Sequence, residues 1–282
     1  MASDSMRDRL YTTEAIVLSR LDYGEADRIL TLFTPSRGKL NAIAKGARRP
    51  KSRAGPHLDF LARCSLQLAR GRELDVVTSA ETVEAHEGLR ADLAAFGHGC
   101  HLAEVVRHLT RDRQEHRSVY ELLAGSLTLL NDGVDPWPVT RHFELAALSA
   151  FGYQPELYQC LNCRQPIEAV PNAFSAQLGG IVCPRCRTID PGAMPLSVNA
   201  QKYLRTLDRA GLSTAARLRP SEQERVEVES VLGTYLRTVA ERDLSSLTIL
   251  RSLTAGTDQF PDKSRPATTA AVWPEDDRSS VR

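Results

Sequence analysis

Residues 10–80 contain a series of short apolar segments separated by turn-forming residues. The segments read TEAIVLSRL, RILTLFT, GKLNAIAKG, LARCSLQLAR and ELDVVTSA. The first two are rich in β-branched and large apolar residues, and the third and fourth alternate partly between apolar and polar positions. Turn signals lie between them, at Tyr23-Gly24, Thr34-Pro35 through Gly38, Gly55-Pro56 and Gly71. The pattern predicts about five short strands in a small barrel or sandwich.

After about Ala80 the apolar positions recur with the period of a helix. One predicted face comprises Leu102, Val105, Val106 and Leu109. A second comprises Val139, Phe143, Ala146, Ala147 and Ala150. Pro138 lies near the first turn of that second helix, and Gly152 follows its end. Ser221 and Glu224 form a capping-box pair before a third helix. Its apolar stripe comprises Val228, Val231, Leu232, Tyr235, Leu236 and Val239.

The change of period divides the chain into two units. Its 282 residues suffice for one large domain or two ordinary ones. We expect an α+β protein with a β unit at residues 1–80 and a helical unit at 81–255. From about Gly256 the chain is rich in Pro, Thr, Ser, Asp and Arg, which predicts a disordered tail at 256–282.

The composition is that of a soluble globular protein, with 42% hydrophobic and 25% charged residues. No apolar run approaches the ~20 residues that a membrane-spanning helix needs. The N-terminal stretch MASDSMRDRLYTTE lacks the apolar core of a signal peptide. We therefore expect a cytoplasmic protein with no membrane partner, whose six cysteines are not paired as disulfides.

Four of the cysteines form two close pairs, in CLNC and CPRC, with nineteen residues between the pairs. Two such turns facing each other complete a tetrahedral thiolate shell, and the spacing is typical of a zinc site. The predicted ligands are Cys160, Cys163, Cys183 and Cys186. Because four protein ligands leave no position for water or substrate, the zinc would be structural. A redox CxxC remains an alternative. Cys64 and Cys100 are expected to be packing residues.

Arginine stands where many zinc-binding turns have glycine after the second cysteine, at Arg164 and Arg187. Four thiolates around Zn²⁺ leave a formal charge of −2. Arg164, Arg185 and Arg187 are placed to offset that charge.

The net charge of +1 hides an asymmetry. Residues 1–80 hold 14 Lys or Arg and 9 Asp or Glu, a balance of +5, and the remainder holds 22 and 26, a balance of −4. The stretch Gly38–Gly55 holds six cations and no acidic residue. A solvated loop is the simpler interpretation. The alternative is a surface that follows a phosphate backbone, because Arg48 and Arg49 can form paired hydrogen bonds with phosphate and Ser52 can add another.

No familiar catalytic motif is present: the chain has no G-x-x-x-x-G-K-[ST], no G-x-S-x-G and no H-E-x-x-H. His101, Glu104 and His108 share one helical face, which we interpret as solvated. Glu25 and Asp27 lie beside Arg28 in YGEAD, where local salt bridges are expected. The pattern favours a protein that is not an enzyme.

The stretch EAIVLSRLDYGEADRILTLFTPSRGKLNAIAKGARRPKSR resembles the N-terminal signature of the bacterial RecO family of recombination mediators. The later GYQPELYQCLNC and GGIVCPRC also match, so the resemblance covers roughly residues 10–255. It implies an N-terminal OB-fold β-barrel and an all-α helical domain that carries a four-cysteine zinc-binding insertion at about 157–190.

The resemblance also implies a function. RecO-family proteins bind single- and double-stranded DNA, anneal complementary strands and help to load the RecA recombinase. Their partners are the RecR protein, RecF where it is present, and single-strand-binding protein. They would associate with the nucleoid during repair. By position, the DNA-contacting candidates are Arg37, Lys39, Lys45, Arg48, Arg49, Lys51 and Arg53.

Two other classes of function remain open from the residues alone. One is a zinc-ribbon adaptor whose basic loop binds an acidic protein partner. The other is a nucleic-acid enzyme, which needs a carboxylate or histidine cluster able to hold Mg²⁺. Arg107, Arg111, Arg113 and Arg117 are either added DNA contacts or a solvated helix face.

Overall fold

The structure is a computed structural model that describes residues 9–241 and 244–254. The disordered tail expected at 256–282 lies outside the described residues. Among the helices of those residues, none combines the length and apolar character needed to span a membrane.

The first unit is a closed five-stranded barrel with strand order β1-β2-β3-β5-β4. Each predicted strand segment is confirmed. The β3–β5 pair is parallel and the other pairs are antiparallel. The strand bounds are β1 Leu10–Tyr23, β2 Asp27–Thr34, β3 Gly38–Ala44, β4 Arg63–Ala69 and β5 Asp75–Glu84.

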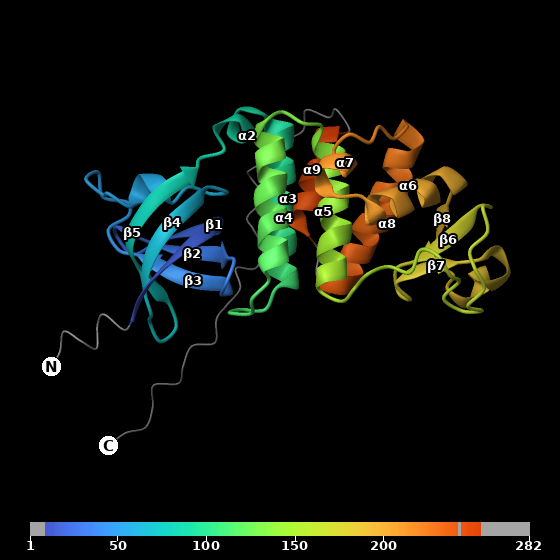
Figure 1. The fold of residues 1–282 in the computed structure, drawn as a ribbon, viewed down its shortest axis with the longest axis horizontal. Coiled ribbons are helices and arrows are strands. Elements are labelled where there is room, and N and C mark those ends of the chain that lie inside the picture. The colour runs from blue at the N-terminus through green and yellow to red at the C-terminus, as the bar shows by residue number, and fades with distance from the viewer. Residues whose placement is uncertain (1–8, 242–243, 255–282) are drawn as a thin grey trace, which may run out of the picture.

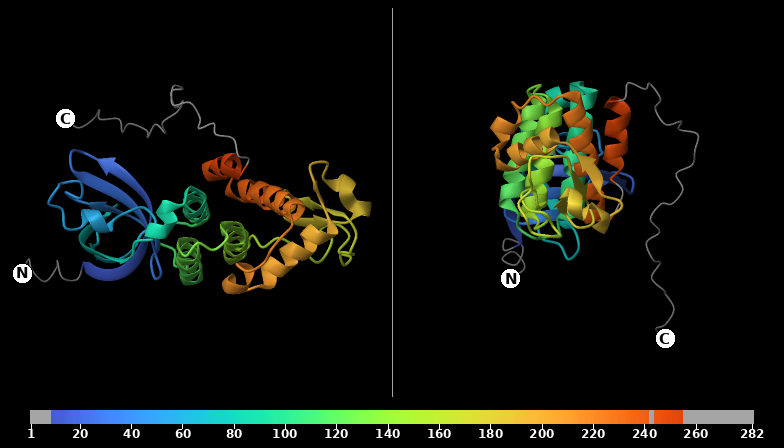
Figure 2. Two further views of the ribbon diagram at one scale, coloured as in Figure 1. Left: turned by 90° about the horizontal axis from the view of Figure 1, so that it is seen from above. Right: turned by 90° about the vertical axis from the view of Figure 1, so that its right-hand side faces the viewer.

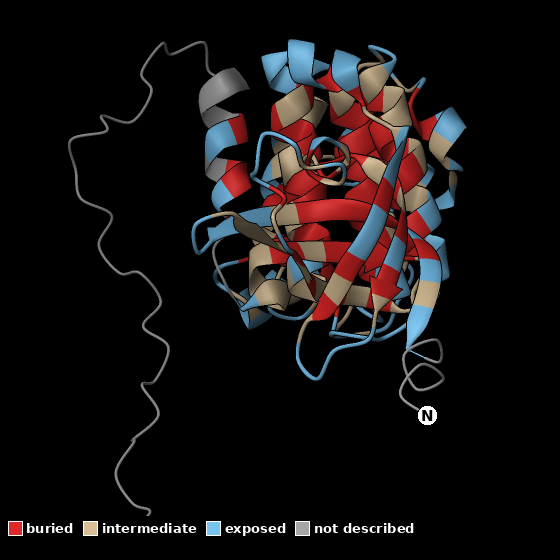
Figure 3. Cartoon of the chain, turned by 90° about the vertical axis from the view of Figure 1, so that its left-hand side faces the viewer, coloured by how far each residue is buried: buried red, intermediate tan, exposed pale blue. Residues whose placement is uncertain are grey.

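The barrel has a core of its own because its strands place alternate residues inside. In β3, Leu40, Ala42 and Ala44 are buried while the residues between them are only half-buried. Figure 3 views this end of the molecule and shows buried positions along the strands. Phe33 faces outward instead and packs against Tyr120 of the helical unit, with the ring centroids 6.1 Å apart. Outward apolar positions therefore join the barrel to the larger core.

Helices form the middle layer of the molecule, between the barrel and a small sheet (Figures 1 and 2). Their apolar stripes meet in one core, as the helical periodicity predicts. The bounds are α2 Glu87–Ala91, α3 Leu93–Leu109, α4 Arg117–Asn131, α5 Pro136–Ala150, α6 Val198–Arg209, α7 Leu212–Ala215, α8 Glu222–Ala240 and α9 Ser245–Thr254.

The predicted helix boundaries are confirmed by local geometry. Ser221 and Glu224 make both reciprocal hydrogen bonds of a capping box at the start of α8. Gly152 has φ of +83° just beyond the end of α5, a conformation that glycine adopts at low cost.

The second unit is not all-α, which corrects the sequence-based expectation. Its insertion contains a three-stranded sheet of order β7-β6-β8 and a 3₁₀ segment. One of these strands, β8, lies wholly beyond the end of the insertion that was predicted at about residue 190. Strands this short carry too few residues for a recognisable alternating pattern. The bounds are β6 Asn172–Ser175, β7 Gly180–Val182, η2 Pro184–Ile189 and β8 Met194–Leu196.

Candidate nucleic-acid interface and metal centre

The basic connection, defined as residues 45–53, follows β3 and projects from the end of the barrel farthest from the small sheet (Figure 1). Its backbone forms a series of turns. The Gly46 N–H donates to Asp27 Oδ1 at 2.7 Å, and the Arg48 N–H donates to the Ala26 carbonyl at 2.9 Å. Gly46 has φ of +66°, which allows the chain to turn there. The backbone is thus anchored on the β1–β2 turn while the long basic side chains stay exposed.

Five cations of the basic connection are exposed: Lys45, Arg48, Arg49, Lys51 and Arg53. Arg48 lies 3.3 Å from Asp22, measured from Nε to Oδ2. Among the described residues, the other four have no ion-pair partner. Crowded like charges repel, so this surface is suited to an anionic partner.

Two predicted contact residues lie elsewhere. Lys39 is at the start of β3, and its Nζ donates to the carbonyls of Arg107 and Thr110, both at 2.7 Å. It also lies 3.3 Å from Asp112. Its charge is therefore used to join the barrel to α3. The Arg37 guanidinium stacks on Tyr11, 4.1 Å from the ring centroid.

The aromatic side chains that were candidates for stacking on bases differ in how exposed they are. Phe33 is fully buried, whereas the exposed fraction of Tyr23 is 55%. Phe60 packs edge-to-face on Phe96, with the ring centroids 6.0 Å apart. Ser52 Oγ accepts the Gly55 N–H at 3.0 Å, so it shapes the loop. This arrangement favours contact with a phosphate backbone over base readout.

The four cysteines of CLNC and CPRC converge at the end of the molecule opposite the barrel. Their Sγ atoms all lie within 4.8 Å of one another, and those of Cys163 and Cys183 are 3.9 Å apart. Tetrahedral Zn–S bonds of about 2.3 Å place sulfur atoms about 3.8 Å apart, so the donor set fits zinc. All four are free thiols, and Cys64 and Cys100 lie outside the cluster.

Backbone hydrogen bonds prepare the first cysteine turn for a metal. Arg164 has φ of +60°, the left-handed conformation for which glycine is the usual residue. Burial raises the pKa of the Cys160 thiol, but N–H groups of Cys183, Cys163 and Asn162 outweigh burial and lower that pKa. The thiolate form that binds metal is therefore favoured at this position.

Sequence reasoning missed a polar contact between the CLNC turn and the CPRC turn. The Asn162 Nδ2 donates to Cys186 Sγ at 3.3 Å, which links the two cysteine pairs. The sequence did offer a signal for this contact, because Asn162 is an amide side chain that lies between the two cysteines of CLNC.

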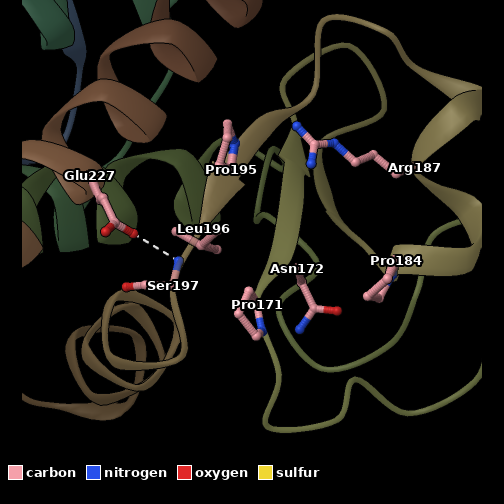
Figure 4. Close-up of a pocket in the computed structure, with 8 residues that line it drawn as sticks. All are labelled: Pro171, Asn172, Pro184, Arg187, Pro195, Leu196, Ser197 and Glu227. Carbon is pink, nitrogen blue, oxygen red and sulfur yellow. Dashed lines mark hydrogen bonds between the residues drawn. The ribbon is translucent and has the colours of Figure 1, made fainter.

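A hollow of about 480 Å³ lies where the insertion meets α6 and α8 (Figure 4). In it, Glu227 Oε2 accepts the Ser197 N–H at 2.7 Å, and Ser197 Oγ accepts the Ala200 N–H at 3.2 Å. Both polar groups thus support the start of α6 and do not form a nucleophile–base pair. The lining residues are Pro171, Asn172, Pro184, Arg187, Pro195, Leu196, Ser197 and Glu227.

The interpretation of His101, Glu104 and His108 as a solvated face is wrong for His101, which is fully buried. Its Nε2 lies 2.6 Å from Glu144 Oε1, and its Nδ1 lies 2.8 Å from Ser246 Oγ. Glu104 accepts N–H groups from the start of α9. Helical periodicity places these residues on one face, but the packing of α5 and α9 decides that the face is covered.

The local salt bridges expected for Glu25 and Asp27 beside Arg28 are not found: in the part of the chain that the structure describes, neither carboxylate has an ion-pair partner. Arg28 pairs with Asp22 at 3.2 Å, from Nε to Oδ1, across the β1–β2 turn. Asp27 accepts the Gly46 N–H, as described above. These carboxylates position the turn that carries the basic connection.

Two family models together cover most of the chain. The model described as "Recombination protein O N terminal" matches residues 6–86, and "Recombination protein O C terminal" matches residues 90–248. The chain belongs to the RecO family. The boundary between the two matched regions lies between β5 and α3, where the barrel ends and the helices begin.

Relatives named "DNA repair protein RecO" are similar over nearly their full length. The chain is 40% identical to that of Roseiflexus sp. (strain RS-1), covering 87% of this chain and 86% of the relative. It is 33% identical to that of Dehalococcoides mccartyi (strain CBDB1), covering 86% and 96%. It is 34% identical to that of Symbiobacterium thermophilum, covering 86% and 98%. The RecO resemblance stated from motifs is confirmed.

Proposed function

We propose that this RecO-family protein acts in DNA repair and recombination as a non-enzymatic, DNA-binding mediator in the cytoplasm. The observation that carries the proposal is the basic connection: five exposed cations, four of them without ion-pair partners among the described residues, held at one end of a closed barrel. Its strand order supports an OB-fold, whose grooves suit single strands.

Annealing follows from the charge of the two strands. Complementary strands repel through their phosphates, and cations that neutralise those phosphates lower the barrier to pairing and release counterions. Because the contacts are to phosphate, binding accepts any sequence. The protein would thereby anneal complementary strands and help to load RecA onto DNA coated by single-strand-binding protein. RecR, and RecF where present, would assist.

The four cysteines would hold a structural Zn²⁺ that stabilises the insertion, because binding of a metal to a site absent from the unfolded chain adds to folding free energy. When bound, zinc would neutralise part of the thiolate charge and cross-link the two cysteine turns. The insertion in turn supports α6, because Asn172 Nδ2 donates to Gln201 Oε1 at 3.0 Å and Gln201 Nε2 donates to the Val170 carbonyl at 2.9 Å.

The test is annealing of complementary oligonucleotides by the full chain over a range of salt, without nucleotide triphosphate. We expect salt-sensitive acceleration. The double variant Arg48→Ala with Arg49→Ala should slow annealing and reduce the salt slope of single-strand binding by about 1.4, at about 0.7 per phosphate contact.

A matched control removes the same charge from the helical unit. Arg217 and Arg219 are exposed, and within the described part of the chain their guanidinium groups donate to nearby backbone carbonyls and to no carboxylate. The variant Arg217→Ala with Arg219→Ala should keep the wild-type slope. An unchanged slope in the Arg48 and Arg49 variant, with the fold intact, would contradict the assignment. No acceleration by wild type at low salt would favour the adaptor function.

A further inference from the structure

A second group of cations lies around turns at the other end of β3 from the basic connection. We call it the turn cluster. Its members come from the β2–β3 turn, the β4–β5 turn and the α3–α4 region. They are Arg37, Arg70, Arg72, Arg107 and Arg111. All but Arg37 are exposed, and Arg37 is half-buried on Tyr11.

Segments far apart in sequence meet here because β3 binds the α3–α4 connection. The Lys39 carbonyl accepts the Arg113 N–H at 2.7 Å, and the Lys39 ammonium donates to the carbonyls of Arg107 and Thr110. A Cβ at Gly38 would lie 1.7 Å from the Gln114 carbonyl oxygen, so only glycine permits this approach. The arginines of the α3–α4 region are thereby held beside the barrel.

One buried carboxylate fixes the β4–β5 turn to the same place. Asp75 is fully buried and accepts hydrogen bonds from the Tyr11 hydroxyl, from the Gly71 N–H at 3.1 Å and from Arg113 at 3.0 Å. Arg37 and Arg70 both lie over the Tyr11 ring, at 4.1 and 5.9 Å from its centroid. Asp75 therefore joins β1, β5 and the helical unit beneath the cations.

The turn cluster keeps an excess of positive charge. Asp75 is paired with Arg113, and Asp112 is paired with Lys39. On the β2–β3 turn, the β4–β5 turn and the α3–α4 connection, the other carboxylates are Glu73 and Glu115, both exposed. Five arginines face these two, so the surface attracts anions.

The two basic surfaces are held apart by the length of a strand. Arg37 directly precedes β3 and Lys45 directly follows it, and β3 has seven residues. At about 3.3 Å per residue, the eight residue steps from Arg37 to Lys45 span about 26 Å. That is comparable with the width of a nucleic-acid duplex. In Figure 1 the basic connection lies at the upper left, and the β4–β5 turn and the α3–α4 connection lie along the lower edge.

We propose that the turn cluster is a second surface for a single-strand phosphate backbone, which holds one strand while the basic connection holds its complement. This inference rests on the proposed annealing function. One surface alone would have to crowd the phosphates of both strands, whereas two surfaces keep the backbones apart and leave the bases free to pair. The Tyr11 and Asp75 contacts position the second surface.

The test compares two double variants of the full-length, metal-containing chain: Arg70→Ala with Arg72→Ala, and Arg48→Ala with Arg49→Ala. A fluorescent single-stranded oligonucleotide is titrated at low salt to obtain the number of strands bound per chain, and annealing rates are measured in parallel. We expect two strands per wild-type chain and one per chain of either variant. Each variant should anneal at least tenfold more slowly.

The Arg217→Ala and Arg219→Ala control should match wild type in both measurements. Because Arg70 contacts Tyr11, the charge reversals Arg72→Glu and Arg111→Glu serve as a second test that leaves the buried network intact. If the Arg70 and Arg72 variant and both reversals retain two bound strands and wild-type annealing while the Arg48 and Arg49 variant fails, the inference is overturned and the proposed function stands. If all of them behave as wild type, the proposed function fails too.

Discussion

The basic connection and the buried cluster around Glu144 use charge in opposite ways. In the basic connection, arginines and lysines are exposed and mostly lack ion-pair partners among the described residues. In the helical unit, Arg141 and His101 both contact Glu144 Oε1, at 3.1 and 2.6 Å, and all three side chains are essentially inaccessible to solvent. The first charges are free for a partner molecule, and the second are used within the protein.

The difference has a physical cause. An exposed charge without an ion-pair partner costs the folded state little free energy, since water solvates it. A charge in the interior must find its partner within the fold, or the folded state is strongly destabilised. Substitutions at the two regions should therefore separate binding from stability.

The metal centre should show the largest effect. Cys183→Ser removes one of four thiolates, so we expect loss of bound zinc and unfolding of the insertion, because metal binding and folding are coupled. Elemental analysis and limited proteolysis near residues 157–196 measure both. Cys100→Ser, outside the cluster, is the control and should retain metal. Purified wild type with essentially no zinc would show that the ligand assignment is wrong.

Removing the buried carboxylate should give the next largest effect. Glu144→Ala leaves Arg141 without its ion-pair partner, and we expect a loss of about 3–5 kcal/mol in the free energy of unfolding. Glu121→Ala breaks an exposed pair with Arg117 and should cost no more than about 0.5 kcal/mol. Urea denaturation measures both, and similar losses would remove the proposed contrast between buried and exposed pairs.

Stability of the helical unit should depend on pH through His98. Burial, reinforced by Arg141 and His101, lowers the pKa of His98 to about 3. Below pH ~6.5 the His98 imidazole binds a proton in the unfolded chain but not in the folded chain. The free energy of unfolding therefore decreases as the pH falls toward 3.

The variant His98→Asn removes this proton-binding difference. The slope of unfolding free energy against pH between 4 and 6 should become shallower by up to about 1.4 kcal/mol per pH unit. Urea denaturation at several pH values gives the slope. Equal slopes in the variant and wild type would exclude His98 as the source.

The smallest stability effect is expected in the basic connection. Arg48→Ala with Arg49→Ala should change the free energy of unfolding by no more than about 0.5 kcal/mol while DNA binding weakens. Chemical denaturation and oligonucleotide binding on the same preparation compare the two. A loss above about 1 kcal/mol would mean that the Arg48–Asp22 contact supports the fold.

Local patterns predicted the parts of this protein that depend on neighbouring residues. The strand segments, the α8 capping box and the cysteine pairs are confirmed because alternation, capping and CxxC turns are set within a few residues. The insertion sheet was missed because its strands have only three or four residues. The burial of His101 was missed because it depends on α5 and α9, which lie far along the chain.

The sequence by itself determined the change from strands to helices after about residue 80, the four converging thiols, the RecO family and the excess of cations in the first 80 residues. Only the tertiary structure decided which cations stay available. It uses Lys39 to join the barrel to α3 and leaves Lys51 and Arg53 exposed. The sequence sets where the charged residues lie along the chain. Long-range packing sets whether each charged side chain contacts other protein groups or the solvent.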